Sequence, residues 1–155
     1  MKLAVILLLA FIMGVGGYVA MQSWSPYLSD STQAIQLQAE AADCSLEKQA
    51  CTAANDQAHI VLTLTPQPIP LMKPVQSSVQ LSGLANLDAV QLRIEGVNMY
   101  MGFQSVQLNK RPDNEWQGSF SLPICSESAM HWRVLVNLTS QQQSYQATFN
   151  LATQR

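Results

Sequence analysis

The chain has 155 residues, which is room for one domain and a membrane anchor but not for two full domains. Charged residues make up 12% of the chain, about half the share in an average soluble protein, and the net charge is −2. Because no cluster of Lys and Arg provides the basic surface that nucleic acids require, nucleic-acid binding is excluded.

Residues 1–21 are the first predicted element, a transmembrane anchor whose positions 3–21 carry no charge. A helix rises about 1.5 Å per residue, so this stretch nearly spans a hydrocarbon core of about 30 Å. Lys2 precedes the stretch and no Lys or Arg follows before Lys48, so the positive-inside rule keeps the N-terminus cytoplasmic. We expect a single pass through a bacterial inner membrane with the rest of the chain in the periplasm. A cleaved signal peptide is the alternative, although Val19-Ala20-Met21 is a poor cleavage site.

Residues 22–57 are rich in Ser, Gln and Ala and are predicted to form a tether, with a short helix over Thr32–Ala42. Cys44 and Cys51 lie near its end. In an oxidising compartment these two thiols can close a disulfide loop, and their spacing does not match a CxxC redox or zinc motif. Cys125 is then the odd cysteine, although it could instead pair with either of the other two.

Residues 58–155 carry apolar side chains at every second position, which is the period of half-buried strands. The proline-rich run 66–74 interrupts this pattern and is expected to be a connection or an edge, because proline cannot donate to a sheet. No helical periodicity lies between the strand segments. The pattern therefore predicts an immunoglobulin-like β-sandwich of about seven strands, over residues 60–64, 79–81, 90–94, 106–108, 116–122, 132–138 and 145–151.

Enzymatic activity finds no support in the sequence. The two histidines, His59 and His131, stand in no recognisable catalytic triad or dyad. No glycine-rich phosphate loop or HExxH motif occurs. We therefore expect a protein that is not an enzyme.

Five side chains with soft donor atoms form the candidate metal site: Met99, Met101, Cys125, Met130 and His131. Met99 and Met101 are two positions apart, so on an extended backbone both thioethers point to the same side. Thioether, thiolate and imidazole donors suit Cu(I), and no carboxylate cluster favours a harder metal. The alternative is ordinary packing, because methionine also fills irregular apolar gaps.

The same residues carry a family resemblance, which covers residues 44–140. The layout of Cys44 and Cys51, the proline-rich connection, Met99-x-Met101-Gly102, the Trp116-Gln117-Gly118 turn, Cys125 and Trp132 resembles the FixH and YtkA-like group of membrane-anchored bacterial proteins. The resemblance implies a small β-sandwich close to copper supply or cytochrome oxidase assembly. Phe103 replaces a histidine that follows the methionine pair in that group, so only Met99, Met101 and Cys125 match by position.

Two functions follow as expectations. The first is a membrane-anchored accessory protein that handles Cu(I) or assists assembly of a respiratory oxidase. The second is a non-metal interaction module that docks on a membrane complex through a strand edge or through residues 66–74.

Overall fold

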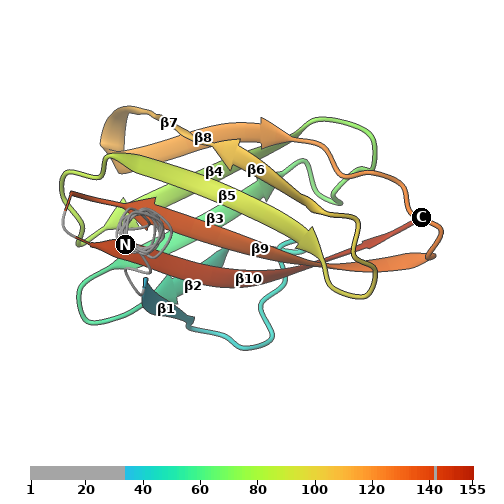
Figure 1. The fold of residues 1–155 in the computed structure, drawn as a ribbon, viewed down its shortest axis with the longest axis horizontal. Coiled ribbons are helices and arrows are strands. Elements are labelled where there is room, and N and C mark those ends of the chain that lie inside the picture. Colours follow the sequence, from blue (N-terminus) through green and yellow to red (C-terminus); the bar gives the residue numbers. More distant parts are fainter. Residues whose placement is uncertain (1–33, 142) are drawn as a thin grey trace, which may run out of the picture. The chain divides into compact units, whose positions relative to one another are not determined.

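The computed structural model describes residues 34–141 and 143–155, and the predicted anchor lies outside this range. The described residues form an all-β domain, which confirms the predicted fold class at that level (Figure 1). They contain ten strands and one short 3₁₀ turn, Pro112–Asn114. No helix among them is long and apolar enough to cross a bilayer.

The strands have the following bounds: β1 Ile35–Ala39, β2 Cys51–Ala54, β3 His59–Thr65, β4 Val75–Ser82, β5 Ala89–Gly96, β6 Phe103–Gln107, β7 Asn109–Lys110, β8 Glu115–Phe120, β9 Ala129–Thr139 and β10 Ser144–Gln154.

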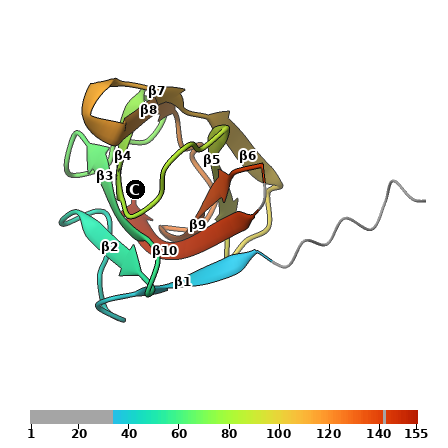
Figure 2. The ribbon, with the colours of Figure 1, turned by 90° about the vertical axis from the view of Figure 1, so that its left-hand side faces the viewer.

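One mixed sheet joins all ten strands in the order β6-β5-β9-β10-β1-β2-β3-β4-β8-β7. The strand β1 links its two halves, because it runs parallel to β10 on one side and antiparallel to β2 on the other. Seen end-on, the sheet curls into a ring that nearly closes between β6 and β8 (Figure 2). The Gln104 side-chain amide donates a hydrogen bond of 2.9 Å to the Ser121 carbonyl near this closure.

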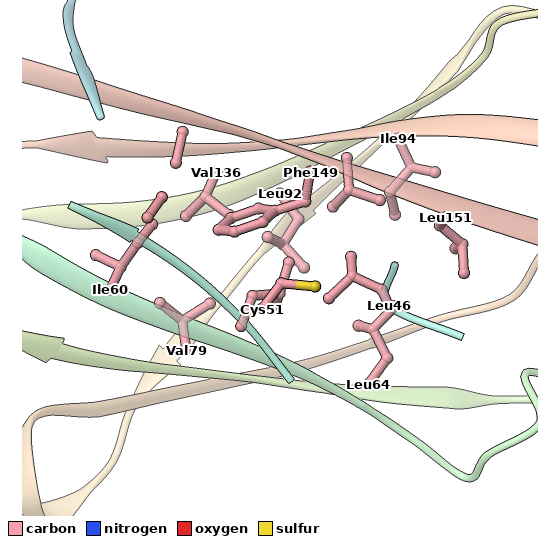
Figure 3. Close-up of a cluster of buried hydrophobic side chains, with 14 of the residues drawn as sticks. Leu46, Cys51, Ile60, Leu64, Val79, Leu92, Ile94, Val136, Phe149 and Leu151 are labelled. Atoms are coloured by element: carbon pink, nitrogen blue, oxygen red, sulfur yellow. The ribbon is translucent and has the colours of Figure 1, made fainter. Parts of the chain in front are cut away.

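The core lies inside the ring, where every second residue of the long strands is buried. Ile60 and Leu64 of β3 meet Leu92 of β5 and Phe149 of β10 there (Figure 3). Each such side chain contributes about 1.5–3 kcal/mol through its removal from water. The two-residue period of the sequence therefore corresponds to the alternate residues that form this core.

The strand number differs from the prediction. All seven predicted segments contain strands, but β1, β2 and β7 are additional, and two of them lie within the predicted tether of residues 22–57. That tether prediction is wrong for 35–39 and 51–54, because Leu37, Cys51 and Ala53 point into the core. The predicted Thr32–Ala42 helix is likewise replaced by β1 over 35–39. The more specific prediction, an immunoglobulin-like β-sandwich, stays a prediction.

Cys44 and Cys51 form a disulfide, with Cα atoms 5.8 Å apart, so the expected pairing is confirmed. The bridge closes the connection from β1 to β2. Between the two cysteines, Leu46 is fully buried and donates its backbone N–H to the Asn150 carbonyl at 3.1 Å. Cys125 keeps a free, buried thiol.

Candidate functional site

Two segments that carry the predicted soft ligands meet at one end of the domain. The strand β5 ends at Gly96, which pairs with Trp132 of β9, and the loop 97–102 then leads into β6. The segment 121–128 leads into the start of β9 at Ala129. Both connections therefore lie beside the first residues of β9.

The sulfur atoms of Met101 and Cys125 lie 3.0 Å apart, where the thiol donates to the thioether. Met99 Sδ lies 3.9 Å from the hydroxyl oxygen of Ser126, the neighbour of Cys125. Two sulfurs bound to one metal at about 2.3 Å each lie no more than about 4.6 Å apart. The two sulfurs are therefore close enough to reach one ion once they separate to about 4 Å, and the Met99 thioether lies next to Ser126.

Met130 and His131 do not point the same way, because consecutive residues of a strand face opposite sides. Met130 is buried on the inner face of β9, and its methyl group lies near Gly96. His131 is exposed on the outer face. Of the five predicted ligands, the structure thus brings Met101 and Cys125 into contact and places Met99 next to Ser126, the neighbour of Cys125. Met130 lies beneath the methionine loop, and the His131 imidazole points away from Met130.

A small pocket of about 50 Å³ lies beside Met101. Its walls are mostly apolar, with Gln104 as the polar side chain, and no charged side chain lines it. It is large enough for a single ion or a few water molecules. Its lining residues are Ile94, Met101, Gly102, Phe103, Gln104, Leu122, Pro123 and Trp132.

The side chains of Cys125 and Met101 differ in solvent exposure. Cys125 is 7% exposed, whereas Met101 is 42% exposed. Around Met101 the surface is apolar, since five of the six exposed large hydrophobic side chains of the described residues come from these two segments and the first residue of β6. They are Val97, Tyr100, Met101, Phe103 and Ile124. A donor atom can therefore reach solvent at Met101 while its partner stays shielded.

Three charged side chains near this end form a network on the outer face of the sheet, and Glu127 is exposed in the segment 121–128. Glu95 pairs with Arg93 at 3.4 Å and with Arg133 at 3.2 Å. The Arg93 guanidinium also lies over the ring of Phe103, 3.9 Å from its centre. Because Phe103 stands where the resemblance has a histidine, this position carries a cation–π contact instead of an imidazole donor.

Three residues at this end had no site role in the sequence analysis. Asn98 hydrogen-bonds to the backbone at both Ala129 and His131, Ser126 contacts Met99, and Trp132 lines the pocket. The sequence indicated only that Asn98 lies in a turn, because its hydrogen-bond partners are more than thirty positions away in the chain. The sequence predicted Trp132 as a strand residue, but its closeness to Met101 depends on the pairing of β5 with β9.

Comparison with family models, with curated proteins and with solved structures finds no match to this chain. Within residues 34–141 and 143–155, no three His, Cys, Asp or Glu side chains gather into a group that could hold a metal. The candidate site instead consists of two thioethers and one thiol.

Proposed function

We propose that this chain is a membrane-anchored periplasmic protein that binds Cu(I) through Met99, Met101 and Cys125, in copper handling or in the assembly of a respiratory oxidase. The observation that carries the proposal is the 3.0 Å contact between the sulfurs of Met101 and Cys125. Polarisable thioether and thiolate donors select Cu(I) over harder divalent metals.

Charge balance also favours a monovalent ion. A single thiolate from Cys125 neutralises Cu(I), and the two thioethers add no charge. With these three donors alone, a divalent ion would keep one uncompensated positive charge beside an apolar surface, which is costly. The apolar lining of the pocket next to Met101 therefore suits Cu(I) better than Zn²⁺.

The solvent exposure of the donor residues supports exchange of Cu(I) with a second protein rather than permanent storage. Met101 is 42% exposed, so an incoming ligand from a second protein can approach the metal at this side chain. Cys125 is buried and would hold the ion during that approach. A copper donor or acceptor of an oxidase assembly pathway is the class of partner that this arrangement fits.

Competition titration of the full-length chain in detergent tests the proposal. Ascorbate keeps copper reduced, and a chromophoric Cu(I) chelator reports how much metal the protein withdraws. We expect one Cu(I) per chain, and an affinity at least about tenfold lower in Met101→Leu and in Cys125→Ser.

Two control variants make the titration specific. Met72→Leu removes an exposed thioether that does not line the pocket, and His131→Ala removes an imidazole on the outer face. Both should bind Cu(I) like the unmodified chain. An unmodified chain that withdraws no more copper than Met101→Leu would refute the proposal.

An interaction module that needs no metal is the second candidate function. The exposed apolar side chains around Met101, above all Tyr100, Phe103 and Ile124, favour it, because such patches mark contact sites. A pull-down with the full-length chain should then recover a partner. Recovery that survives Met99→Leu with Met101→Leu, but not Tyr100→Ser with Phe103→Ser, would favour this function over copper binding.

A further inference from the structure

Asn98 connects the methionine loop to the neighbouring strand through both ends of its side-chain amide. The Asn98 Nδ2 group donates to the Ala129 carbonyl at 3.0 Å, and the backbone N–H of His131 donates to Asn98 Oδ1 at 2.9 Å. One residue earlier, the Val97 N–H donates to the His131 carbonyl at 2.8 Å. The side chain thus extends the pairing of β5 with β9 beyond the end of β5.

Gly96 allows the loop to fold back closely over the end of β5. A Cβ atom at this position would lie 2.3 Å from the Met99 carbonyl oxygen and 3.2 Å from the Met130 methyl group. The chain therefore folds back over Gly96 closely enough that only glycine fits without a shift of the backbone. Gly96 thus permits the close return of the chain at Met99, and the Asn98 hydrogen bonds hold the start of the loop.

We infer that Asn98 is a positioning residue that sets the Cu(I) affinity of the sulfur site, an inference that rests on the proposed function. Two hydrogen bonds from one side chain hold the loop 97–102 in place before any metal arrives. Without them, binding would have to order the loop and its flexible thioether side chains, which lowers affinity. Outer contacts that orient metal ligands typically change affinity by about 10–100-fold.

Asn98→Ala in the full-length chain tests the inference by the same Cu(I) competition titration. We expect an affinity lower by about 10–100-fold than in the unmodified chain. Asn98→Asp is the second variant: it keeps the acceptor for the His131 N–H but sets a carboxylate oxygen against the Ala129 carbonyl, so it should also lose affinity. Asn137→Ala is the matched control, because it removes one side-chain amide hydrogen bond, which Gln146 donates, on β9, the strand that Asn98 contacts.

A second readout separates positioning from general stability. In metal-free protein with ¹³C-labelled methionine methyl groups, Asn98→Ala should move the Met99 and Met101 signals toward those of a flexible chain and leave buried Met130 dispersed. In a chain that already carries Met99→Leu and Met101→Leu, Asn98→Ala should change the remaining Cu(I) affinity by less than about twofold, since coupled residues are not additive.

The titrations separate a failure of Cu(I) binding itself from a failure of Asn98 to position the methionines. If the unmodified chain withdraws no Cu(I), both the proposed function and the inference are overturned. If it binds Cu(I) and both Asn98 variants bind equally well, only the inference is overturned. An affinity loss of the same size in the double methionine variant would likewise refute positioning of the methionines.

Discussion

At the scale of single residues, Glu47 ties the disulfide loop to the last strand by its carboxylate. It accepts hydrogen bonds from the Ser45 hydroxyl and, at 3.1 Å, from the Ala152 N–H. Burial by itself raises the pKa of Glu47, but these hydrogen bonds and the nearby Lys48 charge outweigh burial and lower the pKa below its usual value of 4.5. Because the folded pKa is the lower one, Glu47 stabilises the fold above that usual value and loses this effect as pH falls through the folded pKa.

We therefore expect Glu47→Gln to lower the free energy of unfolding near neutral pH and to have less effect at about pH 3. Urea unfolding at both pH values measures the difference. Asp43→Asn is the control, because Asp43 is exposed in the same connection between β1 and β2. An equal loss from Glu47→Gln at both pH values would contradict the role given to the ionised carboxylate.

The candidate ligands were identifiable from the sequence by donor chemistry, but their grouping was predictable only in part. Met99 and Met101 lie in the irregular loop 97–102, so the expectation that an extended backbone points both thioethers to the same side does not apply. They come near Cys125 and Ser126 because β5 and β9 are paired, a contact between distant segments. Met130 and His131 were separable in advance, since adjacent residues of a strand face opposite sides.

At the scale of elements, the disulfide connection between β1 and β2 contributes to stability chiefly by restricting the unfolded chain. A loop of this length is worth about 2–3 kcal/mol in the chain-entropy estimate. We expect the double variant Cys44→Ser with Cys51→Ser to lose about that much free energy of unfolding in urea. Cys125→Ser, which breaks no disulfide, serves as the comparison, and a double variant as stable as the unmodified chain would show that the bridge adds nothing.

The long strands were predictable because five or more consecutive positions alternate between apolar and polar residues, as in β9 and β10. The short strands were not. Each of β1 and β2 offers only one or two buried side chains, Leu37 in β1 and the small Cys51 and Ala53 in β2. These two strands are recognisable only through their pairing with β10 and β3, which the local pattern does not encode.

At the scale of the whole domain, the sulfur site and the entry of the described chain lie at opposite ends. Ile35 pairs with Tyr145 at the start of β10, whereas Ala129, beside the site, pairs with Gln154 at its end (Figure 1). At about 3.3 Å per residue, these positions are roughly 30 Å apart along β10. A partner that exchanges copper with Met101 would thus approach the end of the domain away from Ile35.

Copper-edge X-ray absorption of the full-length chain loaded with one Cu(I) measures the proposed ligands directly. We expect a first coordination shell made only of sulfur, at about 2.3 Å, and the loss of one sulfur from that shell in Cys125→Ser. A shell of nitrogen or oxygen, or an unmodified chain from which copper is lost on desalting, would contradict this expectation.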